Sequence, residues 1–432
     1  MPTASPRVVV LGAGFAGLRA VRRLGRAGVA TLWVDARNYH CFQPLLYQVA
    51  TAGLEPQDIA YPARSILRRL RAVDFRLARV TGADPPARQL LTSTGEPIPY
   101  DYLIVATGGA AEDFGIPGAR DASFRLYDLE DSRALRNHVL RICERATTET
   151  AADERAALLT IVIVGGGATG VETAGALAEF RRHVLPRDYR AFDASAMRII
   201  LVEAGPELLP PFPPALRSRA RCDLEAFGVD VRTGARVSRI TPTRVELVDG
   251  EQIPTHTAIW AAGIRAAPVA AQLGFPTGRS GRLLAEPTLQ VPGDAHVFVA
   301  GDVALVAGEE GLPQVAQVAI QQGEHAAENV LRMLHGAPPL AFRYRDKGSL
   351  ATIGRSRAVA AIRGFAFAGH LAWWVWLVVH LVMLIGFRNR LVVLVNWAWN
   401  YFTYDRGLRA IVGADQDPGE DAERQRAAGG SG

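Results

Sequence analysis

Six glycines fall into two groups of three that share one spacing. They are Gly12, Gly14 and Gly17 in the first group, and Gly165, Gly167 and Gly170 in the second. At this spacing the first glycine permits a tight turn, the second lets backbone amides reach a pyrophosphate, and the third allows close packing of a helix on a strand. The partial positive charge at the start of the helix favours the phosphates. The two groups therefore predict two dinucleotide-binding sites.

An acidic residue ends the strand that follows each glycine group. Apolar runs flank the groups at 8–11 and 31–34, and at 161–164 and 199–202. Asp35 and Glu203 directly follow the second run of each pair. A carboxylate at this place, roughly 20 residues after the glycines, accepts a hydrogen bond from a ribose hydroxyl. The interval before Glu203 is longer than usual, and we interpret the arginine-rich residues 181–197 as an insertion.

Three further predicted strands end in small residues, which let the backbone approach a flat cofactor. The ends are Ala106, Thr107 and Gly108, then Ala262 and Gly263, and finally Gly301 followed by Asp302. We expect these residues to contact the dinucleotides, together with Phe15, Ala16, Ala168 and Thr169 beside the glycines. Asp302 suits a hydrogen bond from a cofactor hydroxyl, and the alternative is an N-cap for the next segment.

The two glycine patterns favour an α/β electron-transfer enzyme with two Rossmann-like dinucleotide-binding domains, and the length of the chain allows it. The chain has 432 residues, of which 49% are hydrophobic, enough for two or three domains. Two complete dinucleotide patterns indicate two nucleotides in one chain. Cys41, Cys143 and Cys222 lie far apart without a C-x-x-C pair. We therefore expect reduced, buried thiols and no metal site.

Three other segments carry candidate functional residues: the loop at 37–53, the helix predicted at 314–334, and the segment around Lys347. The long apolar and aromatic loop at 37–53 carries Gln43, Pro44, Tyr47 and Gln48. Loops of this length in compact domains are more often functional.

A helix predicted at 314–334, opened by Pro313, places Gln317 and Gln321 on one face and Gln322 elsewhere. On composition alone, a solvent-facing surface is the simpler interpretation of this pair. Lys347 is the only lysine in the chain. Because arginine does not replace a compact ammonium group at every site, Lys347 is a functional candidate, against the alternative of chance.

The C-terminal region differs in charge and in aromatic content. Residues 343–409 carry ten Arg or Lys against two Asp, a local charge of +8. Since the whole chain has a net charge of +5, the rest of the chain carries about −3. This asymmetry favours an anionic membrane surface over nucleic acid. Residues 364–387 carry no charge and are long enough for a transmembrane helix, which needs roughly 20 residues. A lone crossing would strand the basic residues that follow, so we favour shallow insertion, with 391–404 as an amphipathic interfacial helix.

Together these features resemble the type II NADH:quinone oxidoreductases, the single-subunit, non-proton-pumping NADH dehydrogenases of bacterial respiratory membranes. The resemblance covers residues 7–412. Its most specific parts are 38–53, 165–172, 316–323, 346–354 and the tryptophan-rich C-terminal region. Cys41, where relatives commonly have an apolar residue, is a small departure.

The resemblance implies non-covalent FAD on the first glycine group, with Asp35 and Asp302, and NADH as substrate on the second, with Glu203. Because Ala204 and Gly205 follow Glu203 in place of arginine, the site favours NADH over NADPH. Hydride passes from NADH to the flavin, and two electrons then pass to a membrane quinone, ubiquinone or menaquinone.

The resemblance also assigns roles to side chains. It places Glu172 near the proton exchange of the quinone, although a first-turn helix carboxylate is the alternative. It gives Gln317 and Gln321 contact with the flavin and the quinone head, and it lets Lys347 hold a charge partner or a quinone oxygen. The loop residues Gln43, Pro44, Tyr47 and Gln48 would line the quinone pocket.

The expected organisation follows from these assignments. Residues 1–112 and 265–342 form the FAD domain, 113–264 an inserted NADH domain, 343–412 a helical membrane-anchoring region, and 413–432 a disordered tail. We expect a homodimer on the cytoplasmic face of the inner membrane, held by the C-terminal Trp-rich and Arg-rich helices, with a transmembrane helix at 364–387 as the alternative.

Three other functions share parts of this pattern. A sulfide:quinone oxidoreductase needs a cysteine pair beside the flavin, and the three cysteines are not in the expected places. A soluble ferredoxin or rubredoxin reductase has no use for five C-terminal tryptophans. A flavoprotein redox sensor would be reduced by NADH but not quickly reoxidised by quinone.

Overall fold

The computed structural model describes residues 7–403 and 409–412, and the predicted tail at 413–432 lies outside them. Packing divides the chain into two units. Unit 1 comprises Met1–Cys41, Ala60–Glu112 and Ile264–Asp346, and unit 2 comprises Phe42–Ile59, Asp113–Gly263 and Lys347–Gly432. The structure therefore groups loop residues 42–59 with the second glycine group, since helix α2 (Leu46–Ala50) packs on helices α5 (Leu129–Thr148) and α7 (Ala168–His183).

Unit 1 is built on a six-stranded sheet. Its order is β21 (Gln290–Val291), β22 (Asp294–Val299), β9 (Tyr102–Val105), β1 (Val8–Leu11), β2 (Thr31–Asp35) and β5 (Val73–Leu77). All neighbours are parallel except β21 and β22. Strand β1 is buried at every residue, as expected for the centre of a parallel sheet covered on both faces.

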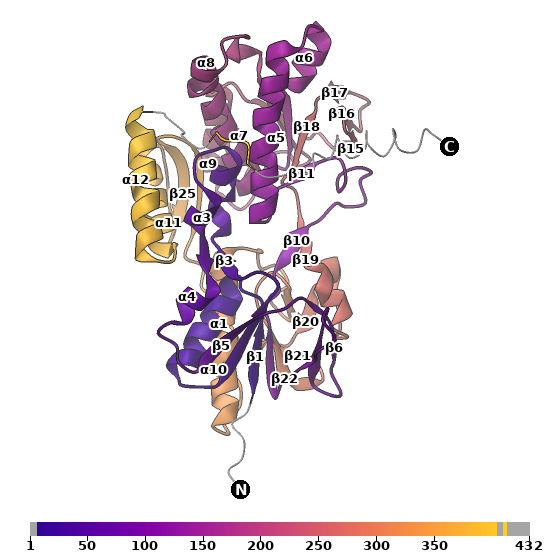
Figure 1. Ribbon diagram of the computed structural model, residues 1–432, viewed down its shortest axis with the longest axis vertical. Coiled ribbons are helices and arrows are strands. Elements are labelled where there is room, and N and C mark those ends of the chain that lie inside the picture. The colour runs from indigo at the N-terminus through magenta and orange to yellow at the C-terminus, as the bar shows by residue number, and fades with distance from the viewer. Residues whose placement is uncertain (1–6, 404–408, 413–432) are drawn as a thin grey trace, which may run out of the picture. The chain divides into compact units, whose positions relative to one another are not determined.

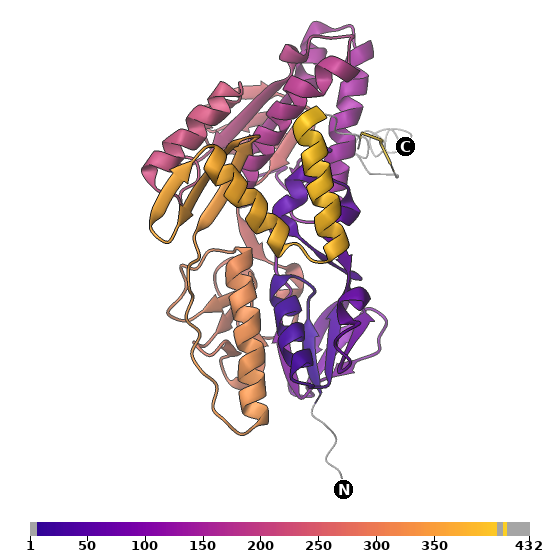
Figure 2. The same cartoon turned by 90° about the vertical axis from the view of Figure 1, so that its left-hand side faces the viewer.

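Two helices of unit 1 lie side by side, α1 (Phe15–Arg26) and α10 (Ala316–Leu334) (Figure 2). Gly323 of α10 faces the backbone of α1, and a Cβ there would lie 2.1 Å from the carbonyl oxygen of Ala16. The helix predicted at 314–334 is present, and it begins two residues further along the chain than predicted, at Ala316.

Smaller elements complete unit 1. They are β3 (Tyr39–Cys41) with β4 (Ala60–Pro62), α4 (Ala63–Leu67), the sheet β6 (Val80–Asp84), β7 (Gln89–Thr92) and β8 (Ile98–Pro99), the pair β10 (Gly109–Ala111) and β19 (Ile264–Ala266), and the pair β20 (Leu283–Ala285) and β23 (Ala304–Val306).

Unit 2 repeats the parallel plan with five strands. Their order is β11 (Phe124–Arg125), β18 (Thr257–Trp260), β12 (Thr160–Val164), β13 (Arg198–Glu203) and β14 (Asp230–Thr233). Its larger helices are α5, α6 (Ala152–Leu158), α7 and α9 (Pro214–Ala226), and the short ones are α2, α3 (Pro56–Ile59) and α8 (Leu185–Asp188) (Figure 1). A small sheet, β15 (Val237–Thr241), β16 (Arg244–Leu247) and β17 (Gln252–Pro254), follows.

The C-terminal part of unit 2 is an antiparallel sheet on which one helix packs, with a second helix beside the first (Figure 2). The sheet is β24 (Ser349–Gly354), β25 (Arg357–Ile362) and β26 (Phe365–Ala368), and the helices are α11 (His370–Met383) and α12 (Phe387–Thr403). Within residues 7–403 and 409–412, no helix is long and apolar enough to cross a membrane.

The alternative of one transmembrane helix at 364–387 is wrong. Phe365–Ala368 pairs with β25, Gly369 turns the chain with a φ of 80°, and the helix that follows has 14 residues. The segment is uncharged over the predicted length. However, its first residues form strand β26, so the helix is shorter than the uncharged run. The thiols also differ from expectation, because Cys143 is buried, Cys41 is half-buried and Cys222 is exposed.

Candidate functional site

The first glycine group forms a turn whose three positions have different demands. Gly12 has a φ of 112°, and a Cβ there would lie 2.1 Å from the carbonyl oxygen of Ala106. A Cβ on Gly17 would lie 1.9 Å from the oxygen of Gly12. A Cβ on Gly14, the N-cap of α1, would meet nothing within 4 Å. The protein itself therefore needs glycine at the first and third positions, whereas the second leaves room that suits a pyrophosphate.

The second glycine group has the same geometry in unit 2. Gly165 has a φ of 116°, and its Cβ would lie 2.7 Å from the oxygen of Ala261. A Cβ on Gly170 would lie 1.9 Å from the oxygen of Gly165, and one on Gly167, the N-cap of α7, would meet nothing within 4 Å. Both turns thus fit a dinucleotide phosphate at a helix N-terminus, which Phe15 and Ala16 begin in α1 and Ala168 and Thr169 in α7.

Each strand-end carboxylate is tied to its own glycine turn. Oδ2 of Asp35 accepts a hydrogen bond from the N–H of Ala13 at 2.6 Å, and Oε2 of Glu203 accepts one from the N–H of Gly166 at 2.5 Å. Oε1 of Glu203 also accepts from the N–H of Gly205 at 2.6 Å. Burial raises the pKa of Asp35, and backbone hydrogen bonds to it partly offset that shift. Both carboxylates therefore lie beside the glycine turn of their own unit.

The small-residue strand ends also match between the units. Gly108 after β9 and Gly263 after β18 each have a φ of 70°, and Ala106 and Ala262 precede them on the same turns. The hydroxyl of Thr107 is buried and finds no hydrogen-bond partner among the described residues. A buried donor of this kind suits a cofactor at this edge of the sheet.

Sequence reasoning missed the partner of Gly301. The side chain of Gln322 is buried, and its Oε1 accepts a hydrogen bond from the N–H of Gly301 at 2.7 Å. Gly301 has a φ of 85°, and the backbone oxygen of the next residue, Asp302, accepts from Gln314 at 3.0 Å. Gln322, which lies off the face of α10 that carries Gln317 and Gln321, therefore holds the turn that carries Asp302.

Gln317 and Gln321 share one face of α10, as their spacing predicts. Gln321 donates to the oxygen of Arg345 at 3.0 Å and accepts from its N–H at 3.1 Å, as a neighbouring strand would. Gln317 donates to Oδ1 of Asp346 at 3.5 Å. This pair lies in unit 1, whereas Lys347, which is exposed, is the first residue of the last segment of unit 2.

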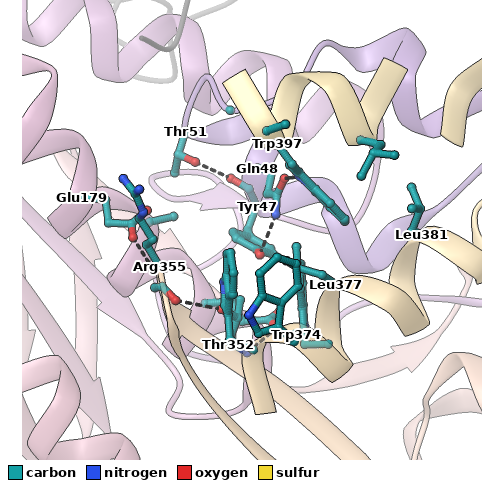
Figure 3. A pocket seen from close by; sticks show the side chains of 18 of the residues that line it. Tyr47, Gln48, Thr51, Glu179, Thr352, Arg355, Trp374, Leu377, Leu381 and Trp397 are labelled. Atoms are coloured by element: carbon teal, nitrogen blue, oxygen red, sulfur yellow. Dashed lines mark hydrogen bonds between the residues drawn. The ribbon is translucent and has the colours of Figure 1, made fainter. Parts of the chain in front are cut away.

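Unit 2 contains a cavity of about 410 Å³, within the usual range for small-molecule sites. Its walls are Tyr47, Gln48, Thr51 and Gly53; Glu172, Ala176, Glu179 and His183; Thr352, Gly354 and Arg355; and Trp373, Trp374, Trp376, Leu377, Val378, Leu381, Leu394, Trp397 and Ala398 (Figure 3). The walls come from α2, α7, β24, α11 and α12. They are largely apolar and aromatic, with a few polar groups that converge, as in sites for flat apolar ligands.

Glu172 is the buried acid of this cavity. It lies one turn inside α7, is 8% exposed, and its Oε1 accepts a hydrogen bond from the N–H of Thr352 at 3.2 Å. Burial raises the pKa of Glu172 to about 8, while the Thr352 amide and the Trp376 indole partly favour the carboxylate. The carboxyl is therefore largely protonated at neutral pH and can give up a proton.

The loop candidates divide into two pairs. Tyr47 and Gln48 line the cavity, where Gln48 donates to the hydroxyl oxygen of Tyr47 at 2.9 Å. Gln43 donates to the oxygen of Tyr127 at 3.1 Å, and neither Gln43 nor Pro44 is a wall residue.

The tryptophans were predicted only as membrane anchors. Trp376 is 1% exposed and stacks on His380 with ring centroids 4.1 Å apart, and Trp397 donates to Gln48 at 2.8 Å. Burial lowers the pKa of His380 to about 4, so this ring is neutral. Only the tertiary structure shows that these aromatic residues face inward.

Two family models match different parts of the chain, and the second begins at residue 347, where the last segment of unit 2 begins. Residues 6–323 match the pyridine nucleotide-disulphide oxidoreductase family, and residues 347–404 match the NDH2 C-terminal domain. Type II NADH:quinone oxidoreductase Ndh of Mycobacterium tuberculosis is 38% identical, over 95% of this chain and 92% of that protein. The type II NADH:quinone oxidoreductase of Staphylococcus aureus is 33% identical, over 85% of this chain and 92% of that protein.

Solved structures show the same fold. NDH2 from Plasmodium falciparum, in complex with NADH, aligns with a TM-score of 0.87 at 18% identity, over 95% of this chain and all of that one. The sulfide:quinone oxidoreductase of Aquifex aeolicus aligns with a TM-score of 0.72 at 18% identity, over 89% of this chain and 91% of that one.

Proposed function

The chain belongs to the type II NADH:quinone oxidoreductases, and on that premise we propose that the cavity of unit 2 is where its quinone is reduced, with Glu172 as proton donor. As a member, the enzyme transfers electrons from NADH through FAD to a quinone, without pumping protons. The observation that carries the proposal is a buried carboxyl, held by the Thr352 amide, in an aromatic cavity that suits a quinone ring.

The two glycine turns divide the nucleotides between them. We assign FAD to Gly12, Gly14 and Gly17 with Asp35, and NADH to Gly165, Gly167 and Gly170 with Glu203. The flavin, when bound, accepts hydride from NADH and gives two electrons to the quinone. The Glu203 carboxylate, tied to its own turn, would repel a 2′-phosphate, which supports NADH over NADPH.

Glu172 supplies one of the two protons that a reduced quinone requires. Its Oε1 accepts a hydrogen bond from the Thr352 amide, so strand β24, which packs on α7, orients the carboxyl. Once ionised, the carboxylate keeps that hydrogen bond and can be reprotonated. Tyr47 and Gln48 add polar contacts for a quinone oxygen.

Stopped-flow absorbance of the flavin tests the proposal in two steps. NADH is added without oxygen, and a short-chain quinone follows. In a Glu172→Gln variant we expect bleaching by NADH at the wild-type rate and recovery with quinone slowed about 10²-fold, a typical loss for a general acid. Glu225→Gln, the same change on the exposed face of α9, is the control and should match wild type.

Other outcomes separate the alternatives. Unchanged recovery in Glu172→Gln would remove Glu172 from the quinone step. Bleaching without recovery in wild type would favour a reductase of a protein partner or a sensor. Reduction by sulfide in place of NADH would favour the sulfide:quinone reaction.

The remaining assignments follow the family resemblance. We propose that the face of α10 with Gln317 and Gln321 contacts the flavin, and that Lys347 serves as a charge partner in the quinone step. Replacement of both glutamines by alanine should slow flavin recovery with quinone more than bleaching by NADH. Equal loss in both steps would count against their role.

An exposed apolar surface supports attachment to a membrane. Along α11, Leu371, Trp374, Val378 and Val382 are each more than half exposed, at helical spacing. On α12, Leu391, Leu394, Val395 and Trp399 are about half exposed. A patch of this size on both helices marks an interaction surface. We propose that it lies in the interface of the cytoplasmic leaflet, beside the exposed Arg388 and Arg390.

Flotation with anionic and neutral vesicles checks this surface. Leu371→Ser with Val378→Ser should reduce flotation with both vesicles, while Leu91→Ser, at an exposed leucine of unit 1, should not. Flotation equal to wild type would show that the anchor lies elsewhere. A homodimer is the other proposed use of the C-terminal region, and loss of dimer mass in the same double variant would show that a second copy covers the patch.

A further inference from the structure

A chain of side-chain hydrogen bonds runs from the interfacial helix into the cavity. The indole N–H of Trp397, on α12, donates to Oε1 of Gln48 at 2.8 Å. Nε2 of Gln48 then donates to the hydroxyl oxygen of Tyr47 at 2.9 Å (Figure 3). All three residues are wall residues of the cavity. We propose that Trp397 is a positioning residue for quinone reduction, which fixes Tyr47 as a hydrogen-bond donor by setting the orientation of the Gln48 amide.

The direction of this chain follows from the donor alone. An indole nitrogen can donate but cannot accept, so only the oxygen of the Gln48 amide can face Trp397. The amide nitrogen must then face Tyr47, whose hydroxyl oxygen accepts. Because that oxygen accepts from Gln48, the O–H of Tyr47 cannot point at Gln48 and is left to donate to another group. A quinone carbonyl is an acceptor, and its oxygen gains negative charge during reduction, so a donor at this wall suits it.

Both ends of the chain are held by their own helices. Helix α12 is docked on α3, since Asn396 donates to Oδ2 of Asp58 at 3.3 Å and Asn389 donates to its backbone oxygen at 3.1 Å. The hydroxyl of Thr51 donates to the backbone oxygen of Tyr47 at 2.9 Å, and the N–H of Gly53 donates to that of Gln48 at 2.6 Å. Asn389 and Asn396 therefore hold α12 at the distance across which Trp397 reaches Gln48.

This arrangement connects the membrane surface to the chemistry. Val395 and Trp399 of α12 are exposed on the apolar patch, whereas Trp397 of the same helix lines the cavity. The helix that attaches the enzyme thus also orients a donor in the cavity. The inference rests on the proposed site of quinone reduction.

A Trp397→Phe variant tests the inference in detergent with a short-chain quinone. It keeps an aromatic ring but removes the N–H, so the Gln48 amide can turn and its oxygen can accept a hydrogen bond from the Tyr47 hydroxyl. We expect kcat with quinone to fall about fivefold, as for the loss of one hydrogen bond, with little change in KM, because the bond strengthens as charge develops. Bleaching by NADH should be unchanged. Trp399→Phe is the matched control, because it makes the same change at an exposed residue of α12 that does not line the cavity. Its kcat with quinone should equal that of wild type.

Tyr47→Phe and the double variant separate positioning from packing. Tyr47→Phe should lower kcat at least as much, and Trp397→Phe with Tyr47→Phe should lose no more than Tyr47→Phe alone, since both act through one donor. Additive losses would overturn the inference, as would a Trp397→Phe variant with the wild-type kcat.

Gln48→Glu keeps the test decisive if Trp397→Phe fails to fold. A carboxylate has the same shape but can only accept, so it takes hydrogen bonds from both Trp397 and Tyr47 and turns the Tyr47 proton away from the cavity. We expect the same loss in kcat, and wild-type kcat would contradict the inference. If Glu172→Gln and the Trp397, Gln48 and Tyr47 variants all leave quinone reduction unchanged, the proposed site itself is wrong. If only the Trp397, Gln48 and Tyr47 variants have no effect, the site stands and the positioning role falls.

Discussion

Helices α1 and α7 begin with the same glycine turn but are covered by different elements. In unit 1, α1 meets helix α10, where a Cβ on Gly323 would lie 2.1 Å from the oxygen of Ala16. In unit 2, α7 meets strand β24, where a Cβ on Gly175 would lie 1.8 Å from the oxygen of Ile353. The close contact is made by the partner's glycine in one case and by the helix's own glycine in the other. Two copies of one motif thus acquire different functions from what packs on them.

The covering strand turns α7 into a wall of the cavity. Because β24 approaches the helix backbone closely at Gly175, its Thr352 amide reaches Glu172. The corresponding approach in unit 1 places Gln322 of α10 on Gly301 instead. The first unit is therefore built around a strand-end turn for a cofactor, and the second also presents a buried acid.

The largest effect on stability should come from adding a side-chain carbon at either of these close contacts. Gly175→Ala and Gly323→Ala each place a Cβ inside the radius of a backbone oxygen, and we expect each to lower the free energy of unfolding by about 3 kcal/mol. Thermal unfolding of the purified enzymes measures this. Gly167→Ala, which would meet nothing within 4 Å, is the control. Stability equal to the control would mean that the packing of α1 on α10 or of α7 on β24 is not as described.

The second prediction uses the acid that only unit 2 presents. Because burial raises the pKa of Glu172 to about 8, it is a competent donor below that pH and loses its proton above it. We expect the rate of flavin recovery with quinone to fall as pH rises through 8, and Glu172→Gln to abolish this dependence. Bleaching by NADH should not show it.

The same shift predicts a change in stability with pH. The unfolded chain releases this proton near pH 4.5 and the folded one near 8, so the contribution of Glu172 is fully present below 4.5 and is lost as pH rises toward 8. Relative to Glu172→Gln, wild type should therefore become less resistant to denaturant between these values. A constant difference between the two proteins would show that the carboxyl is not buried.

The third prediction asks whether the two turns hold different nucleotides. Gly14→Ala and Gly167→Ala should both fold normally, since neither Cβ meets protein atoms. The methyl group should instead obstruct a pyrophosphate. Gly14→Ala should lose flavin on purification, whereas Gly167→Ala should keep its flavin and show a KM for NADH raised about tenfold. Flavin content and steady-state kinetics measure both, and the reverse pattern would exchange the assignments.

The smallest expected effect concerns the two carboxylates. Glu203→Gln keeps the shape of the side chain and removes the charge near a ribose. We expect the preference for NADH over NADPH to narrow about fivefold, through less repulsion of the 2′-phosphate. Asp35→Asn should leave that preference unchanged, because it lies in the other turn. An unaltered ratio in Glu203→Gln would mean that another group selects the dinucleotide.

The sequence by itself determined both glycine turns, the two strand-end carboxylates and the parallel sheets, because these depend on residues near one another in the chain. It also identified Glu172, Tyr47 and Gln48 as candidates through the family resemblance. Helical spacing alone paired Gln317 with Gln321.

Only the tertiary structure decided what those residues touch. The uncharged run at 364–387 became a strand and a short helix because Phe365–Ala368 found a partner in β25. Trp397 turned inward because α12 docks on α3, and burial raises the pKa of Glu172 although the Thr352 amide of β24 donates to it. Burial and hydrogen bonding between distant segments set these properties, and neither composition nor periodicity carries that information.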